Sequence, residues 1–423
     1  WHLADEKFMD FSNDWMDEFK LRFSLGQTGN AASGASLYLG SYASGDNYMD
    51  MSAITPSTMQ LNRLKWETTT EYNTGLDASF LKGKLRFTVD VYQKYIKDLL
   101  QKKVKMPTSI GYGNGYEVSY MNSGKMTNKG WEFRVDAVPF ENRDWRVGFY
   151  FNIAHNENKI TEMPDNYTEE NYTFNNGEYA YRREEGRPMG SFYGYRYKGV
   201  CQNKDATYAR DADGNVMKDI SGNAIVMRNG TATIAPGDAL YEDINHDGVI
   251  NQYDIVYLGN SNPRFTGGAG VNVSYKQFKL SAIFYGRYGQ DVVNSTRLNN
   301  ESMRGIDNQS TAVLRRWRNE GDQTDIPRAL YGEGYNTLGS DRFVEDASYL
   351  RLKSLSFNYR LPKKIIQRWG FSNIDVYVTG YNLFTWTKYT GQDPEVKTEN
   401  TYARDSATTP ASIQLVAGFN LSF

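Results

Sequence analysis

The sequence predicts an all-β fold, the wall of a transmembrane antiparallel β-barrel, and three observations lead to this class. Apolar and polar residues alternate with a period of two in many segments, as in strands with one apolar and one wet face. Short turns alternate along the chain with long polar segments, an asymmetry typical of the two rims of an outer-membrane barrel. No run of about 18 apolar residues occurs, but a barrel strand needs only about 9 to 11 residues to cross a membrane.

The alternation predicts roughly a dozen strands in chain order. The apolar sets of five of them are Leu85, Phe87, Val89 and Val91; Trp131, Phe133, Val135 and Ala137; Trp145, Val147, Phe149, Phe151 and Ile153; Ile374, Val376 and Val378; and Ile413, Leu415, Ala417, Phe419, Leu421 and Phe423. The residues between them are mostly polar or charged, which suits a water-filled lumen on the second face.

The connections between these strands are of two kinds. The segments FLKGKL (80–85), PFENRDW (139–145) and SYKQFKL (274–280) predict tight hairpin turns. Long polar stretches are predicted to form extracellular loops at about 158–187, 200–262 and 292–340. Residues 1–423 are therefore expected to form one domain, the C-terminal part of a barrel.

A soluble antiparallel sandwich or propeller would also show alternation, but aromatic residues gather at the expected strand ends. Such residues form the interfacial girdle of a membrane barrel. They are Trp66, Tyr92, Tyr95, Tyr349, Tyr359, Tyr381, Phe384 and Trp386. Their placement favours the barrel.

Composition excludes several functions. The net charge of −2 offers no basic face for nucleic acid. A single cysteine, Cys201, rules out a disulfide framework within the chain, and no nucleophile with a histidine partner is evident. We therefore expect neither an enzyme nor a nucleic-acid partner.

A dozen strands from this chain cannot close the barrel. An open sheet would leave unpaired backbone groups in lipid at both edges, each costing several kcal/mol. Further strands are expected N-terminal to Trp1 or in a partner chain, whereas the aromatic Phe423 resembles a true barrel end.

The segment DINHDGVINQYD (243–254) has the oxygen-rich spacing of a twelve-residue calcium loop, with Gly248 at the sharp turn. The predicted ligands are Asp243, Asn245, Asp247, Val249 (through its carbonyl), Asn251 and Asp254. The last is not the bidentate Glu of an EF-hand, and the flanks look extended rather than helical. We expect a structural Ca²⁺ that braces an extracellular loop; the alternative is an Asx-rich turn that satisfies its own backbone.

Several stretches resemble SusC/RagA-type TonB-dependent outer-membrane transporters, in the family's own order. They are FKLRFSLGQTGN (19–30), residues 64–100, NSGKMTNKGWEFRV (122–135), GRPMGSFYGYRYKGV (186–200), residues 238–268 and DASYLRLKSLSFNYRLP (346–362). The resemblance implies a 22-stranded barrel in the outer membrane of a Bacteroidetes-type bacterium, closed by an N-terminal plug and energised by TonB. The plug and the TonB-contact segment are not in this chain.

The resemblance also implies partners: a SusD-like surface lipoprotein as a lid, outer-membrane lipid around the barrel, and an oligosaccharide or peptide as the imported solute. A dimer of such barrel–lipoprotein pairs is compatible with it. Substrate contacts are expected in the loops at 166–185 and 332–343, where packing between loops is the competing interpretation. Two other functions stay open: a scaffold of the same family without import, and a soluble calcium-stabilised glycan-binding domain.

Overall fold

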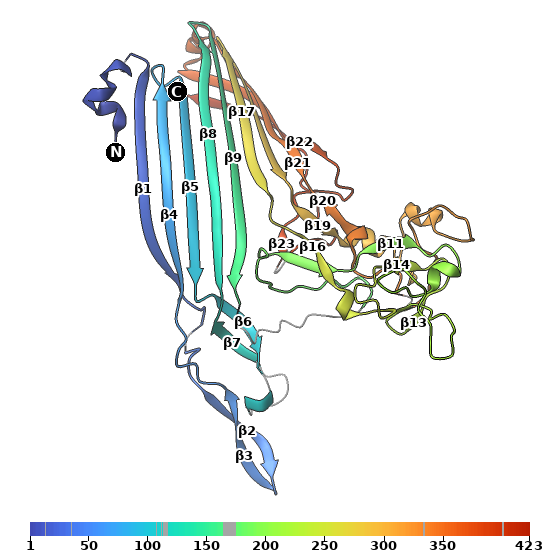
Figure 1. The fold of residues 1–423 in the computed structure, drawn as a ribbon. Coiled ribbons are helices and arrows are strands. Elements are labelled where there is room, and N and C mark those ends of the chain that lie inside the picture. The colour runs from blue at the N-terminus through green and yellow to red at the C-terminus, as the bar shows by residue number, and fades with distance from the viewer. Residues whose placement is uncertain are drawn as a thin grey trace.

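A ten-stranded antiparallel sheet forms the wall of the molecule (Figure 1). The computed structural model describes residues 1–12, 14–34, 36–106, 108–110, 112, 117–163, 175–332, 335–399 and 402–423. In spatial order the wall strands are β1 (Met16–Asn30), β4 (Glu67–Phe80), β5 (Leu85–Lys97), β8 (Lys125–Glu141), β9 (Trp145–Glu162), β17 (Phe265–Tyr275), β18 (Phe278–Tyr288), β21 (Tyr349–Arg360), β22 (Asn373–Thr387) and β25 (Gln414–Ser422). Spatial order follows chain order, so the wall is a meander.

The pairing register places the predicted apolar sets on one face. One continuous row crosses six strands, through Val147, Val273, Leu280, Phe357, Val378 and Ala417. Leu280 and Phe357 are 43% and 46% exposed within the chain. An apolar surface that runs across six strands must be shielded from water. In a barrel wall, the hydrocarbon of the membrane shields it.

The opposite face is charged. Arg22 on β1 donates from Nε to Asp77 on β4 (2.7 Å) and from Nη1 to Asp90 on β5 (2.9 Å). Gly75 makes this cluster possible, because a Cβ there would lie 2.6 Å from both Arg22 Cζ and Asp90 Oδ1. Partly exposed ion pairs are expected on a sheet face that contacts water. The predicted alternation is therefore confirmed, with one apolar face and one charged face on the sheet.

The two ends of the wall differ, as the turns predicted. Residues 81–84, 142–144 and 276–277 are short turns at one end, and the segment 361–372 there carries α2 (Lys363–Ile366) and η8 (Gln367–Trp369). The long connections leave the other end (Figure 1). Among the described residues, no helix has the length and apolar character needed to cross a membrane.

Three details of the prediction were wrong. Among the described residues the wall has ten strands rather than about a dozen. β9 continues to Glu162, so residues 158–162 of the first predicted loop belong to the wall, and one connection, 163–264, contains the rest of that loop and the predicted loop 200–262. The polar end of β9 looks loop-like, but Asn158 donates to Asn128 on β8 (2.9 Å), as a wet strand face allows. The third loop spans 289–348 rather than 292–340.

The long connections carry the remaining elements. Their strands are β2 (Ser41–Tyr48), β3 (Met51–Thr58), β6 (Leu100–Lys105), β7 (Glu117–Asn122), β10 (Ser191–Gly194), β11 (Tyr197–Val200), β12 (Arg228–Asn229), β13 (Ala232–Thr233), β14 (Ala239–Tyr241), β15 (Val249–Ile250), β16 (Val256–Asn260), β19 (Asp291–Asn294), β20 (Val344–Asp346), β23 (Thr398–Glu399) and β24 (Tyr402–Asp405). The helices are α1 (Ser295–Asn300), η3 (Thr108–Ile110), η4 (Asp205–Thr207), η5 (Gln252–Asp254), η6 (Thr311–Arg315) and η7 (Asp341–Phe343), while η1 (Leu3–Asp5) and η2 (Lys7–Ser12) precede β1.

Both edges of the sheet have a single neighbour. Within the described residues, β1 pairs in the sheet only with β4, and β25 only with β22. The strands that would close the barrel therefore stay a prediction.

Candidate functional site at the long-loop end of the wall

The described residues of three connections pack into one loop body at the mouth of the wall. The connections span residues 163–264, 289–348 and 388–413. β19 from the second connection pairs with β20 and, in parallel, with β24 from the third. A buried cluster draws on all three, and its members are Tyr179, Phe192, Val293, Leu298, Phe343 and Tyr402. The buried core of the chain thus lies largely in these loops, which makes the mouth a preformed structure.

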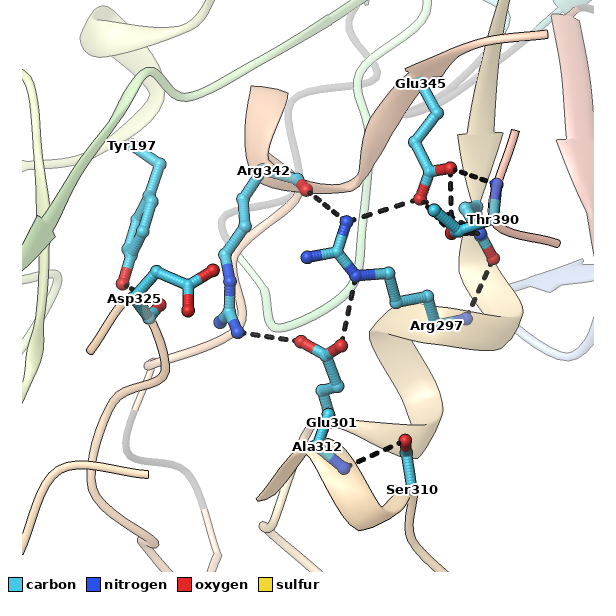
Figure 2. Close-up of polar contacts among 10 residues, drawn as sticks. Tyr197, Arg297, Glu301, Ser310, Ala312, Asp325, Arg342, Glu345 and Thr390 are labelled. Atoms are coloured by element: carbon cyan, nitrogen blue, oxygen red, sulfur yellow. Dashed lines mark hydrogen bonds and ion pairs between the residues drawn. The ribbon is translucent and has the colours of Figure 1, made fainter. Parts of the chain in front are cut away.

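A partly buried ion-pair network fastens the second connection to the third (Figure 2). Arg297 on α1 lies 3.0 Å from Glu301 and 3.2 Å from Glu345, and Arg342 lies 2.8 Å from the other oxygen of Glu301. Glu345 in turn accepts the backbone N–H of Thr390 at 2.9 Å. The side chains of Arg342 and Glu301 are only 4% and 6% exposed, and charges this far from water need partners. The network therefore fixes the relative position of the segments that bear them.

The sequence did not predict this network, because residues 292–340 show only the polar composition of a loop. The signal available was the Arg297–Glu301 spacing of four residues, which predicts a pair on one helical face. Nothing in the sequence linked that pair to Arg342 or Glu345.

The predicted calcium loop closes on itself as a compact turn. Asp243 accepts the backbone N–H of Gly248 at 2.7 Å, and Asp247 accepts that of Val249 at 2.8 Å. Asn245 lies beside them and donates from Nδ2 to Asp247 at 2.9 Å. Gly248 has a φ of +81°, the left-handed conformation that favours glycine.

Asp254 closes the loop from the other side. Its carboxylate is buried and accepts backbone N–H groups of Ile244 and Asn251, both at 2.8 Å. Burial raises the pKa of this carboxyl above its usual value, the two backbone hydrogen bonds oppose the shift, and Asp243 and Asp247 add to it. A nearby cation would favour the charged form.

Val249 and Asn251 are less available as Ca²⁺ ligands than the sequence spacing predicted. Asn251 donates from Nδ2 to the Val249 carbonyl at 3.0 Å, while its Oδ1 accepts the N–H of Tyr253 at 2.8 Å. In the described part of the chain, no three His, Cys, Asp or Glu side chains gather as a metal-holding group. The Ca²⁺ site stays a prediction, with Asp243, Asn245 and Asp247 as its most available donors.

The two loops predicted to contact substrate, 166–185 and 332–343, contact each other through the residues that the structure describes. Residues 164–174 and 333–334 lie outside the described residues. In the remainder, Asn176 forms a bridge with Leu338, and the Tyr179 hydroxyl donates to the Ser340 carbonyl at 2.7 Å. These described residues therefore pack between loops, the alternative that the sequence left open.

A ten-stranded wall with one apolar and one charged face, and a mouth of long packed loops, defines the class as an outer-membrane β-barrel. The family model "TonB dependent receptor-like, beta-barrel" matches residues 10–383, and the chain belongs to this family. Within it the chain is of the SusC/RagA type, as the relatives below indicate.

TonB-dependent receptor P3 of Formosa agariphila is 31% identical over 415 residues, which cover 95% of this chain and 38% of that protein. TonB-dependent receptor SusC of Bacteroides thetaiotaomicron is 27% identical over 443 residues, covering 100% of this chain and 39% of SusC. The solved RagAB peptide transporter superimposes with a TM-score of 0.74 at 27% identity, over 100% of this chain and 42% of that one. The chain thus spans about two fifths of each relative's length. The membership places it in the outer membrane and confirms the predicted family.

Proposed function

We propose that the protein to which this chain belongs imports large nutrients across the outer membrane, driven by TonB, as the SusC-like barrel of a SusCD-type complex. The observation that carries the proposal is the two-faced wall: an apolar face for lipid and a charged face, with Arg22, Asp77 and Asp90, for a wet lumen. We place the rest of the barrel, the plug and the TonB contact in the part of the full-length protein that this chain, two fifths of its relatives' length, does not span.

The preformed mouth supports a lid partner. Loops held by a buried aromatic cluster and by Arg297, Glu301 and Arg342 offer a fixed surface at the long-loop end, which we assign to the extracellular side because outer-membrane barrels carry their long loops there. A SusD-like surface lipoprotein would close over it. The solute is an oligosaccharide or a peptide, and a solved relative is described as a peptide transporter.

We further propose that residues 243–254 bind Ca²⁺ as a brace. Asp243 and Asp247 each accept a backbone N–H of the turn, Asn245 donates to Asp247, and Asp254 accepts the N–H of Ile244 next to Asp243. A cation there would offset the repulsion among the three carboxylates. The role is structural, because the loop belongs to a packed body.

Growth of a deletion strain on single nutrients tests the import proposal. Loss of growth on one class of oligosaccharide or peptide, restored by the full-length protein, supports import. Unchanged growth on every nutrient, together with loss of an outer-membrane complex, supports a non-transporting scaffold instead.

A further inference from the structure

A cavity of about 830 Å³ opens at the mouth, between the wall and the last long connection. Arg287, at the end of β18, contributes from the wall, and the connection 388–413 supplies the rest. Arg287 pairs with Tyr349 in a register that puts it on the same face as Arg351, the charged face of the wall. The cavity therefore lies where a solute would enter the lumen.

The acids that line the cavity are already engaged. Arg351, whose side chain is only 3% exposed, forms ion pairs with both Asp393 and Glu395. Lys353 adds a second pair to Glu395 at 2.7 Å. Asp393 also accepts the backbone N–H groups of Glu395 and Ala411, both at 2.9 Å. These carboxylates are held by their own partners and leave little negative charge for a solute to meet.

Three cations line the same cavity without such partners. In the described part of the chain, Arg287, Lys397 and Arg404 make no ion pair within 4.0 Å. The Nε of Arg287 donates to the Tyr285 hydroxyl at 3.2 Å and that of Arg404 to the Ser295 hydroxyl at 2.7 Å. A guanidinium has five N–H donors, so both keep terminal N–H groups for another acceptor.

The neighbouring acid does not cancel this charge by contact. Asp405 follows Arg404 directly but is buried, and it accepts the Tyr389 hydroxyl at 2.7 Å and the backbone N–H of Ala407 at 3.0 Å. Arg351 and Lys353 pair with the engaged acids, so the described residues of the lining and its neighbours carry five cations against three acids, Asp393, Glu395 and Asp405. The hydroxyls of Thr408 and Thr409 add neutral donors to the lining.

We propose that this cavity binds a carboxylate carried by the imported solute, an acidic residue of a peptide or a uronic acid of an oligosaccharide. The inference rests on the proposed function and narrows its substrate class. Guanidinium groups recognise carboxylates through charge-assisted, often bidentate hydrogen bonds. A cluster of one sign at a channel mouth also raises the local concentration of the opposite charge and speeds its capture.

Binding of matched probes to the full-length receptor, purified with its lipoprotein partner, tests the inference. One pair of probes is tetraglutamate and tetraglutamine, and the other is trigalacturonate and its methyl ester. In at least one pair the acidic probe is expected to bind about ten-fold more tightly, as for a hydrogen bond to a charged group. The difference should shrink at high salt, because the cations are accessible to screening. The responding pair identifies peptide or glycan as the source of the carboxylate.

Variants locate the effect. The double change Lys397→Gln and Arg404→Gln is expected to remove most of the acidic preference, and Arg404→Lys, which keeps the charge but loses the fork, to remove part of it. Lys388→Gln is the matched control, an exposed cation of the same connection outside this cavity. Equal levels of each variant in the outer membrane serve as the folding control.

Two outcomes overturn the inference: no acidic preference in either pair, or a preference that the double variant leaves intact. The experiments distinguish failure of the import proposal from failure of the carboxylate-site proposal. Normal nutrient uptake without acidic preference contradicts only the cavity, whereas the expected binding pattern with no uptake defect in the deletion strain contradicts only import.

Discussion

Arg342 donates from Nη2 to Oε2 of Glu301 at 2.8 Å across 41 residues of sequence, and only 4% and 6% of the two side chains are exposed. Two chain segments of the loop body meet at this contact (Figure 2). Because both charges are removed from water, the pair fixes the position of its segments more than it adds net stability.

Removing one member should be costly. Glu301→Gln leaves Arg342 and Arg297 short of a counter-charge, and we expect a loss of about 3–5 kcal/mol in the stability of the loop body. Limited proteolysis of the folded receptor across a denaturant series measures it. The control is Arg210→Gln, which breaks an exposed pair with Asp205 in another loop and should cost no more than about 1 kcal/mol. Equal protease resistance of the two variants would show that the Glu301 ion pairs do not hold the loop body together.

Gly75→Ala tests the luminal charge cluster. The added Cβ would lie 2.6 Å from Arg22 Cζ and from Asp90 Oδ1, so the three-residue cluster must separate. We expect about 1–3 kcal/mol of destabilisation from this overpacking, read from the heat needed to unfold the barrel in detergent. Gly26→Ala on β1 is the control, since a Cβ there meets nothing within 4 Å. A Gly75→Ala barrel as heat-resistant as the Gly26→Ala barrel would show that the Arg22, Asp77 and Asp90 cluster accommodates the added Cβ.

The assignment of the two faces predicts opposite tolerance to charge at neighbouring positions of β21. Phe357 lies in the apolar row, and Phe357→Arg should cost about 2–4 kcal/mol if the row is near the bilayer midplane. Asn358→Arg, one residue on, points to the other face and should be tolerated. The amounts of the two variants in the outer membrane check this prediction. A larger loss for Asn358→Arg than for Phe357→Arg would mean that the lipid-facing and lumen-facing sides have been assigned the wrong way round.

Cys201 should be chemically quiet in the folded protein. It is fully buried, and burial raises the pKa of its thiol to about 11. Since only the thiolate is nucleophilic, alkylation near pH 8 should be slow until the protein unfolds. Mass spectrometry of iodoacetamide-treated receptor, native against denatured, measures it. Rapid labelling of the native form would show that the loop body is open there.

Calcium removal tests the turn at 243–254. If the loop binds Ca²⁺, a chelator should lower the protease resistance of the loop body, and Ca²⁺ but not Mg²⁺ should restore it. Asp243→Ala should abolish the response, because Asp243 provides the first ligand of the loop. The same resistance with and without chelator would leave the turn as an Asx-rich structure held by Gly248 and Asp254 alone.

The sequence predicted the wall better than the mouth, and the difference has a physical reason. In each wall strand, apolar and polar residues alternate, and this alternation is visible within a few neighbouring residues. The assignment of Phe357 to the apolar face and Arg22 to the charged face therefore follows from the local sequence. The loop body depends on contacts between distant segments, such as Glu301 with Arg342 or Arg351 with Asp393, which no local pattern marks. Even at 243–254 the spacing predicted the turn, but not the hydrogen bond from Asn251 to the Val249 carbonyl.

Uptake of labelled oligosaccharides and peptides by intact cells tests the central claim most directly. Deleting the full-length protein is expected to abolish uptake of at least one large solute, and restoring it is expected to recover that uptake. Cells that lack functional TonB are expected to fail to take up the same solute. Uptake of every labelled solute at the wild-type rate in the deletion strain would contradict it.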